Sequence, residues 1–486
     1  MSPSPTPNIL VIGGGISGLA CAQRLHKEGC SVTLLESGPR FGGVLDTVEK
    51  AGFRFDIGPQ SFLASAAMME LIEELDLGEE LLRADPRAPR YILLRGRLVA
   101  APLGPLSLVR TPLIGWRTKL RLAAEPLGRS YPPDGDDESI AAFIRRKFGE
   151  DLLTNLAGPF ISGVYAGDPE KLSLVSAFPI ARTLEEKFGS VIRGAIKMRR
   201  QAGGGPRQPR PPRPSLCNLR QGTVTLIEAL AKSLGDSARR AAPVSSIRPQ
   251  GPGGQPAGFS ITFQDGGATR SLTASAIIFA TPTQQAGGLL SGVKSQFPDL
   301  LAQIEYAPVA QVAAGYRLSQ ISRFRSRGSG SANANASAPR GFGFLVPRTE
   351  GLRLLGTVWN SFLFPNRAPE TPEKMASFTS FVGGATDPQI YAQSEDEIAA
   401  LVHKELASVL GITGEPIVQY VAKWQRALPQ YNLGHARIVS ALGELCAATP
   451  GIFLTGNYLA GPSMGACVEH ANKTASAAAQ FLGAQP

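Results

Sequence analysis

The stretch NILVIGGGISGLACAQRLHKEGCSVTLLE (residues 8–36) decides the fold of this chain. Its apolar start predicts a buried strand, and apolar side chains recur at helical spacing after the last glycine. The run 32–35 then predicts a second strand. A strand, a glycine-rich turn and a helix in this order are typical of a dinucleotide-binding unit, because unpaired amides at the helix N-terminus attract phosphate.

The residues of the turn serve separate needs of such a unit. Gly13 allows the chain to turn tightly, Gly15 lets the backbone approach a pyrophosphate, and Gly18 lets the helix pack closely on the sheet. Gly14 and Ser17 complete the turn, and we expect them to contact the cofactor as well. The sequence therefore predicts that this turn binds the phosphates of a dinucleotide.

Glu36 selects among the dinucleotides. It follows Gly18 at about the 20-residue spacing expected of an acid that accepts a hydrogen bond from a ribose 2′-hydroxyl. A carboxylate at this position would repel the 2′-phosphate of NADP(H), which leaves FAD or NAD(H) as the expected cofactor.

A second glycine pair favours the flavin. Arg40 supplies a cation just past the acid, and Gly42 and Gly43 are side-chain-free positions that another backbone or a ligand can approach. Gly58 follows in the segment 56–59 (DIGP). This order resembles the FAD-binding half of the amine oxidase and protoporphyrinogen oxidase superfamily. A nicotinamide dehydrogenase does not require the second glycine pair.

Composition limits the partners of the chain. Its 486 residues suffice for about three domains, and 43% hydrophobic with 18% charged residues is ordinary for a globular protein. The formal net charge of +10 invites a nucleic-acid interpretation, but the basic excess lies in two stretches, 197–213 and 322–340. Because the rest of the chain is neutral on balance, we expect no nucleic-acid partner, and surface loops in both stretches.

Cysteine, histidine and hydropathy patterns exclude further classes. Five cysteines form no Cys-x-x-Cys pair, and four scattered histidines show no zinc-ligand spacing, so we expect reduced thiols and no metal. No apolar run reaches the roughly 18 residues of a membrane span, and residues 1–7 lack the pattern of a signal peptide. These features predict a cytoplasmic protein.

The periodicity along the chain predicts an α/β and α+β fold of three domains. They are a discontinuous Rossmann-like FAD-binding domain with a β-meander, a substrate-binding domain with a mixed sheet, and a helical domain that includes a helical segment over 184–198. Their expected bounds are 1–75, 218–290 and 444–486 for the first, 76–105 and 291–443 for the second, and 106–217 for the third.

The C-terminal stretch completes the expected flavin site. A strand breaks on Gly456, and a helix of small residues follows over 465–482, whose N-terminus would point a positive dipole at the flavin. The Gly-Asn-Tyr-x-x-Gly stretch around Asn457 resembles the terminal flavin motif of protoporphyrinogen oxidases. The resemblance also implies flavin contacts for Val244, Trp424, Met464 and Val468. On residue type alone, Val244 is equally well explained as an ordinary residue of the hydrophobic core.

Seven separated segments resemble the protoporphyrinogen oxidase family, in family order from end to end. The resemblance implies oxidation of a porphyrinogen macrocycle to a porphyrin, and such a flat, acid-fringed disc needs apolar walls and few cations. The segments are 88–91, 161–168, 341–347, 355–358, 364–369, 381–384 and 429–435.

The same resemblance implies which residues bind the substrate. Leu345 and Val358 would pack one face of the macrocycle and Phe381 the other. Arg90 would pair with a propionate, and Gly163 would offer its backbone carbonyl to the pyrrole N–H groups. Without the resemblance, the three apolar residues are equally well explained as ordinary core residues of strands. Arg90 is then explained as a surface cation.

The implied reaction transfers hydride from a bridging carbon to FAD, and dioxygen then reoxidises the flavin with release of hydrogen peroxide. No catalytic general base is evident. We expect non-covalent FAD, because the segment 429–435 contains no cysteine. Protoporphyrinogen is the expected substrate, while coproporphyrinogen stays open. A homodimer and a peripheral contact with the inner face of the cell membrane, through the helical domain, also stay open.

Two other interpretations remain at this point. A flavin amine oxidase or a carotenoid desaturase would share the ends of the chain but not its middle, and Tyr431 and Tyr458 could form the aromatic pair that stacks an amine. A non-catalytic FAD-binding protein would use the small-residue helix and the basic stretches as a docking surface.

Overall fold

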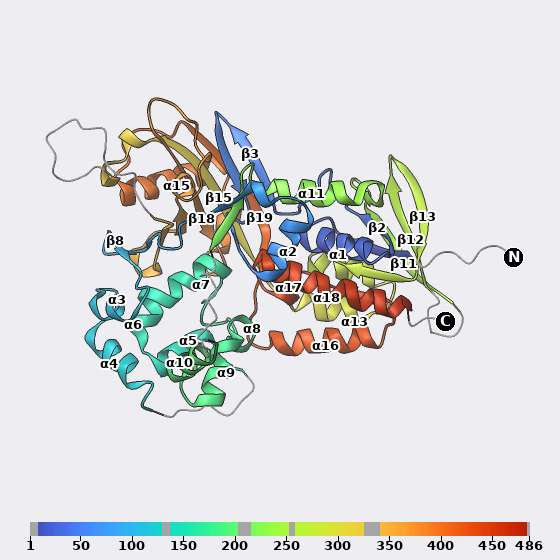
Figure 1. Cartoon of the computed structure of the whole chain (residues 1–486), viewed down its shortest axis with the longest axis horizontal. Helices are drawn as coiled ribbons and strands as arrows, with labels where there is room; N and C mark the ends of the chain where they lie inside the picture. The colour runs from blue at the N-terminus through green and yellow to red at the C-terminus, as the bar shows by residue number, and fades with distance from the viewer. Residues whose placement is uncertain (1–7, 129–136, 203–214, 252–257, 325–340, 484–486) are drawn as a thin grey trace.

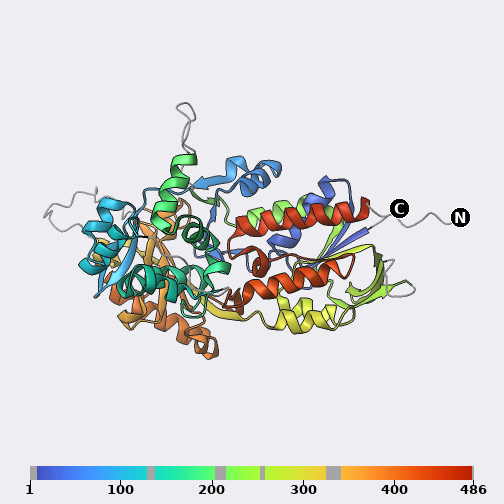
Figure 2. The same cartoon turned by 90° about the horizontal axis from the view of Figure 1, so that it is seen from below.

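The computed structural model describes residues 8–128, 137–202, 215–251, 258–324 and 341–483. The surface loops expected in the basic stretches fall largely on 203–213 and 325–340, outside the described residues. A cofactor lobe with α1 and α18 lies at one end of the long axis, and a large sheet with a layer of helices lies at the other (Figure 1). Figure 2 shows the same division from below.

A parallel five-stranded sheet forms the centre of the cofactor lobe. Its central strands are short apolar runs buried on both faces, as a parallel sheet between two covering layers requires. The strand, helix and strand expected over residues 8–36 are confirmed. The strand order is β10 (Ala238–Arg239), β2 (Ser31–Leu35), β1 (Asn8–Ile12), β14 (Ala276–Phe279) and β20 (Ile452–Leu454).

Helices cover one face of this sheet, and the expected β-meander covers the other. The first face shares a core with α1 (Ile16–Lys27), α2 (Ala66–Glu74), α11 (Val224–Leu234) and α18 (Met464–Gly483). The second face packs on β11 (Val244–Gln250), β12 (Gly258–Asp265), β13 (Ala268–Ala274), α12 (Thr283–Leu290), α13 (Gln296–Ala302) and α16 (His435–Ala447).

A mixed seven-stranded sheet forms the second lobe, as expected for the substrate-binding domain. Its β16–β7 pair is parallel and its other pairs are antiparallel. One face packs on α15 (Glu395–Leu410). The strand order is β19 (Val418–Pro429), β15 (Tyr306–Arg317), β18 (Met375–Gly383), β17 (Leu354–Val358), β16 (Gly343–Leu345), β7 (Arg90–Leu94) and β8 (Arg97–Ala100).

Helices fill the described part of residues 105–202, but the helical segment expected over 184–198 is interrupted. Gly189 has φ +64°, a left-handed conformation that ends one helix, and the Glu125 carboxylate accepts the Val191 amide at the start of the next. The layer comprises α3 (Pro105–Arg110), α4 (Trp116–Ala124), α5 (Ile140–Lys147), α6 (Glu150–Leu152), the π-helical turn η2 (Leu153–Ala157), α7 (Gly158–Tyr165), α8 (Leu174–Ala177), α9 (Pro179–Phe188) and α10 (Val191–Ala202).

Two small sheets interlock the parts of the molecule. β9 (Leu216–Leu219) pairs with both β5 (Phe62–Leu63) and β6 (Leu81–Arg83), and so joins segments that the sequence assigns to three different domains. The hairpin of β3 (Asp46–Lys50) and β4 (Phe53–Ile57) packs its apolar face on β15 of the large sheet. The domain bounds drawn from the sequence stay a prediction.

A buried ion pair lies where these parts meet. The Arg367 guanidinium donates from Nε to Oδ2 of Asp56 at 3.2 Å, and both side chains are fully buried. The Asp56 carboxylate also accepts from the Asn218 side chain at 2.8 Å and from the Thr223 amide at 2.8 Å. Because each oxygen has several donors, the charge stays compensated without water.

The guanidinium of Arg367 completes this network by capping the end of β9. It donates to the carbonyl oxygens of Leu219 and Arg220, at 2.9 and 3.1 Å. Burial lowers the pKa of Arg367 from its ordinary value, and the neighbouring Asp56 carboxylate opposes that shift. The pair therefore fixes β4, β9 and the segment after α14 (Asn360–Leu363) relative to one another.

The Arg367→Met substitution would leave the Asp56 carboxylate buried without its cation. We expect it to lower the free energy of unfolding by about 3–5 kcal/mol, measured by denaturant unfolding followed by circular dichroism. The matched control Arg317→Met removes an exposed pair with Glu373 and should lower it by at most about 1 kcal/mol. Equal losses in the two variants would contradict the role of the buried pair.

Candidate active site

The glycine turn after β1 has the shape that a pyrophosphate requires. Gly13 has φ +109°, and a Cβ at Gly18 would overlap the Gly13 carbonyl oxygen, so α1 approaches the turn only without a side chain there. A Cβ at Gly15 would meet no atom within 4 Å, so open space lies beside the N-terminus of α1. The turn fits a phosphate group held by backbone amides.

The Glu36 carboxylate is fixed at the end of β2. The amides of Gly14 and Gly38 each donate to one of its oxygens at 2.6 Å. These two bonds place the carboxylate beside the phosphate cradle, where the ribose of a bound dinucleotide would follow. Its contact with the ribose stays a prediction that this geometry supports.

The second glycine pair lies directly beside the first turn. The Gly42 amide donates to the Gly14 carbonyl at 2.8 Å, and a Cβ at Gly43 would lie 3.5 Å from the Cα of Gly15. The two backbone segments approach closely because neither carries side chains at the contact. The expectation that another backbone comes close to this pair is confirmed.

Arg40 organises the loop that carries this pair. Its guanidinium donates to the carbonyls of Gly43 and Leu45, at 2.9 and 3.0 Å, and its Nε lies 3.3 Å from the Asp46 carboxylate. Its contact with the cofactor stays a prediction, and the structure gives it a role in shaping the loop.

Gly58 connects the cofactor lobe to the large sheet. It has φ +85°, and its amide donates to Oε1 of Gln311 on β15 at 2.9 Å. The side chain of Gln311 is fully buried and donates in turn to the Asp56 carbonyl at 2.7 Å. The sequence analysis missed Gln311, although a glutamine inside an apolar strand is a signal of a buried polar contact.

The N-terminus of α18 lies beside the start of α1. α18 packs on α1; the Cys467 thiol, in its first turns, donates to the Gly461 carbonyl at 3.7 Å, and Met464 at the start of the helix is 5% exposed. Val468 is fully buried in the core shared with α1. Flavin contacts for Met464 and Val468 stay predictions.

The remaining expected flavin contacts lie at the edges of the lobe. Gly456 has φ +146° and precedes Asn457, which begins α17 (Asn457–Ala460). Val244 is partly exposed and packs against the core under the β-meander. Trp424, on β19, is also partly exposed and packs against the apolar face of the β3–β4 hairpin. Cofactor contacts for these four residues stay predictions.

The expected substrate residues Leu345, Val358 and Phe381 lie on one face of the large sheet. Leu345 pairs with Gly356, which pairs with Phe381, so Leu345 and Phe381 flank a glycine in one row. Val358 lies two residues after Gly356 on β17, so its side chain is on the same face of the sheet. This face is opposite the one that packs on α15, because the alternate residues Phe344 and Phe378 belong to that core.

The row across the sheet reaches the cofactor lobe at its other end. Gln311, which holds Gly58, pairs with Phe381 on the next strand. Neighbouring strands lie about 4.8 Å apart, so the Leu345 and Phe381 positions are about 10 Å apart. A Cβ at Gly356, between them, would lie 3.0 Å from Cδ2 of Leu345, so the Leu345 side chain lies over this glycine. The expected substrate residues therefore lie side by side, in the row that reaches the cofactor loop.

α7 covers the Leu345 end of this face. A Cβ at Gly163 would overlap the Leu345 side chain, so only glycine lets the two elements approach this closely. Gly163 is exposed, as are the side chains of Phe160 and Val164 on the same side of the helix. The structure thus brings together Gly163, Leu345, Val358 and Phe381, which come from separate segments of the sequence.

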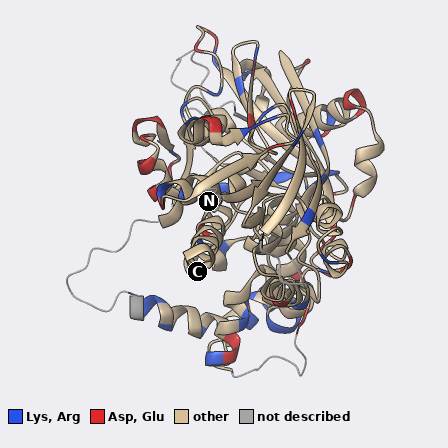
Figure 3. Cartoon of the chain, turned by 90° about the vertical axis from the view of Figure 1, so that its right-hand side faces the viewer, with Lys and Arg blue, Asp and Glu red and all other residues tan. Residues whose placement is uncertain are grey.

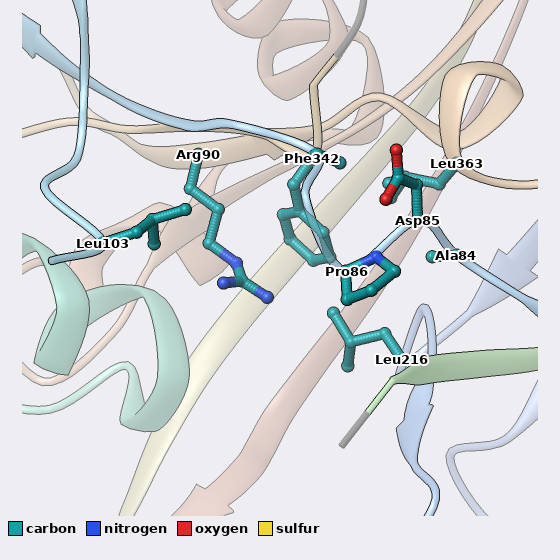
Figure 4. A pocket seen from close by; sticks show the side chains of 9 residues that line it. Ala84, Asp85, Pro86, Arg90, Leu103, Leu216, Phe342 and Leu363 are labelled. Atoms are coloured by element: carbon teal, nitrogen blue, oxygen red, sulfur yellow. The ribbon is translucent and has the colours of Figure 1, made fainter. Parts of the chain in front are cut away.

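Arg90 lines a cavity of about 240 Å³ at the end of β7. Figure 4 shows its guanidinium beside the Phe342 ring, with Asp85 on the far side of that ring. The guanidinium carbon lies 5.4 Å from the ring centroid, a cation–π contact that leaves the guanidinium exposed at the cavity. The other lining residues are Ala84, Pro86, Ala88, Leu103, Leu216 and Leu363.

The sequence profile of the flavin containing amine oxidoreductases matches residues 16–480. The chain belongs to this family. Among curated relatives, the chloroplastic protoporphyrinogen oxidase of Nicotiana tabacum is 33% identical over 99% of this chain and 87% of its own. The coproporphyrinogen III oxidase of Bacillus subtilis is 30% identical over 98% of both chains. A crystal structure from Exiguobacterium sp. 255-15 has a TM-score of 0.78 at 24% identity, covering 98% of this chain and 99% of that one, and confirms the fold.

Membership in this flavoprotein family makes the chain an oxidoreductase with FAD as its cofactor. Burial raises the pKa of the Cys467 thiol to about 11, which favours its protonated form. Non-covalent attachment of FAD stays a prediction.

The aromatic pair expected of an amine oxidase within the family is not exposed here. Tyr431 and Tyr458 are 3% and 1% exposed. The Tyr431 hydroxyl donates to the Asn457 carbonyl at 2.6 Å, and burial raises its pKa well above the ordinary value. The Tyr431 ring packs in the core of the helical layer and the Tyr458 ring in the core of the cofactor lobe, so neither is placed to stack a substrate amine.

The Glu36→Ala substitution would remove the acceptor of two backbone amides and of the expected ribose contact. Charge-assisted bonds of this kind contribute about 1.5–3 kcal/mol each, so we expect the purified variant to lose most of its flavin. The ratio of flavin to protein absorbance measures the content. Glu28→Ala, which removes the pair of Glu28 with Arg24 and the hydrogen bond that Ser476 donates to Glu28, should keep wild-type content. Equal flavin content in both variants would contradict the ribose contact of Glu36.

Proposed function

We propose that the chain oxidises a porphyrinogen to a porphyrin in heme or porphyrin biosynthesis, with protoporphyrinogen IX as substrate. Relatives named protoporphyrinogen oxidase and coproporphyrinogen III oxidase match nearly the whole chain. The observation that carries the proposal is that Gly163, Leu345, Val358 and Phe381 come together on one face of the large sheet, with Arg90 in a cavity at the start of the neighbouring strand β7.

The arrangement of charge favours a substrate with two propionates. Arg90 is the one cation among the residues that line the described cavity. Arg95 and Arg97 lie at the far end of the β7–β8 hairpin, about five residues or 17 Å along the strand from Arg90. Arg182 is paired with Glu186 in the helical layer. Four propionates, as in coproporphyrinogen III, would lack cations here, so that substrate is the weaker alternative.

The expected substrate residues would bind, orient and shield the substrate. FAD, when bound, would supply hydride acceptance in each of three cycles, with dioxygen as the final oxidant and hydrogen peroxide as the product. Leu345, Val358 and Phe381 would exclude water from the macrocycle. Exposed carbonyls of α7 would accept hydrogen bonds from the pyrrole N–H groups. No acid or base is required, because binding and orientation alone lower the barrier.

Anaerobic mixing with protoporphyrinogen IX tests the proposed function. We expect the visible flavin absorbance of the purified protein to bleach, and admission of air to restore it with release of peroxide. Coproporphyrinogen III should bleach the flavin at least about tenfold more slowly at low concentration, since two further carboxylates stay unpaired. Flavin that stays oxidised with both porphyrinogens would refute the proposal, and faster bleaching by coproporphyrinogen would reverse the choice of substrate.

The Arg90→Ala variant should keep its flavin and lose affinity for protoporphyrinogen. Loss of one charged hydrogen bond, about 1.5–3 kcal/mol, raises KM roughly 10–100-fold. Steady-state porphyrin fluorescence measures KM. Arg87→Ala, an exposed neighbour that does not line the cavity, serves as the control and should keep the wild-type KM. An unchanged KM in Arg90→Ala would remove the propionate contact.

We propose that the helical layer also touches a membrane surface on the cytoplasmic side. Among the described residues, no helix is long and apolar enough to cross a bilayer. Trp116 and Leu120 on α4 are 67% and 59% exposed, and exposed Arg117 and Arg121 lie on the same helix. Figure 3 shows blue basic segments among these helices. Cosedimentation with vesicles of acidic phospholipid tests this contact, and a homodimer stays an open proposal for sedimentation analysis.

A further inference from the structure

Asp85 lines the same cavity as Arg90, and it is the one anion among the described residues that line this cavity. Figure 4 shows the two side chains on opposite sides of the Phe342 ring. The other lining residues are alanines, leucines and one proline. The cavity therefore offers a ligand one cation, one anion and otherwise apolar walls.

The charge of Asp85 is not compensated within the described part of the chain, where no residue forms an ion pair with it. Arg83, two residues earlier, donates instead to the Ser215 hydroxyl at 3.1 Å. Arg87, two residues later, is exposed and does not line the cavity. The negative charge of Asp85 thus acts on whatever enters the cavity.

Asp85 also shapes the turn that precedes β7. Its Oδ1 accepts the Arg87 amide at 2.8 Å, and its main-chain carbonyl accepts the Ala88 amide at 3.0 Å. An asparagine makes the same side-chain bond, because its amide oxygen accepts in the same place. The turn alone therefore does not require a charged residue at this position.

The size of the cavity suits one edge of a macrocycle. Sites that enclose a whole ligand of drug size measure roughly 300–1,000 Å³, whereas this cavity measures about 240 Å³. It lies at the start of β7, which pairs with β16, the strand that carries Leu345. A macrocycle on that face of the large sheet would therefore place only its edge substituents in the cavity.

We propose that Asp85 determines which substituent lies next to the propionate held by Arg90. This inference rests on the proposed function. Protoporphyrinogen IX carries vinyl groups at the two positions where coproporphyrinogen III carries its additional propionates. A vinyl group is neutral and fits the apolar walls, whereas a second propionate would meet the carboxylate of Asp85. Because like charges repel in a partly desolvated site, Asp85 selects against the substrate with four propionates.

Arg90 cannot compensate a second propionate. Its guanidinium carbon lies 5.4 Å from the centroid of the Phe342 ring, and that ring separates it from Asp85. One bound propionate pairs with this guanidinium. A second one would add an anion beside Asp85 with no further cation among the described lining residues.

Binding of the two product porphyrins tests the inference without catalysis. Protoporphyrin IX and coproporphyrin III carry the same edge substituents as their porphyrinogens, and porphyrin fluorescence gives the Kd of each. The Asp85→Asn variant removes the charge and keeps the side-chain bond of the turn. We expect it to shift the ratio of the two Kd values about tenfold in favour of coproporphyrin. The ratio of anaerobic flavin bleaching rates at low porphyrinogen concentration should shift in the same direction.

Matched controls separate charge from packing. Asp85→Glu keeps the charge and should keep the wild-type ratio. Asp299→Asn removes an exposed acid on α13, in the cofactor lobe, and should also match wild type. Salt screens repulsion between charges, so the difference between wild type and Asp85→Asn should narrow at about 1 M salt. Flavin content of each variant shows that the fold is intact.

The outcomes distinguish this inference from the proposed function. If wild type binds protoporphyrin and bleaches with its porphyrinogen, but Asp85→Asn keeps the wild-type ratio, the role of Asp85 is overturned and the proposed function stands. Tighter binding of coproporphyrin than of protoporphyrin by wild type also overturns it. If wild type neither binds a porphyrin nor bleaches, both proposals are overturned. A salt-sensitive shift toward coproporphyrin in Asp85→Asn alone supports the inference.

Discussion

The buried pair of Asp56 and Arg367 is the constraint on which the site depends. It joins a hairpin of the cofactor lobe to a segment of the large sheet, and both charges are compensated only while all parts are in place. The main-chain carbonyl of the same Asp56 also accepts the Gln311 side chain, which holds Gly58. One residue therefore aligns the cofactor loop with the first position of the apolar row.

The site separates the tasks of binding and of charge control. Strands supply a rigid, dry surface, because the row from Gln311 to Leu345 is fixed by sheet pairing rather than by loops. The N-terminus of α18 supplies a fixed positive dipole to the cofactor lobe.

The local parts of this structure could be predicted from the sequence, and the non-local parts could not. The glycine turn, its flanking strands and the strands of the large sheet follow from periodicity over a few residues. Gly189 interrupts the segment 184–198 because one glycine in a left-handed conformation outweighs the apolar spacing on both sides. The pairing of Asp56 with Arg367, 311 residues apart, leaves no local pattern. The burial of Val468 on the α1 side of α18 depends on helix rotation, which the sequence pattern alone does not give.

The central sheet of the cofactor lobe has a consequence for the synthesis of the protein. Its middle strand comes from residues 8–12 and its edge strand from residues 452–454, and the final helix covers the first one. An emerging N-terminal half on the ribosome therefore exposes an unpaired β14 edge and an uncovered apolar helix for most of translation. This edge and this apolar helix face are covered only after residues 452–483 have been synthesised.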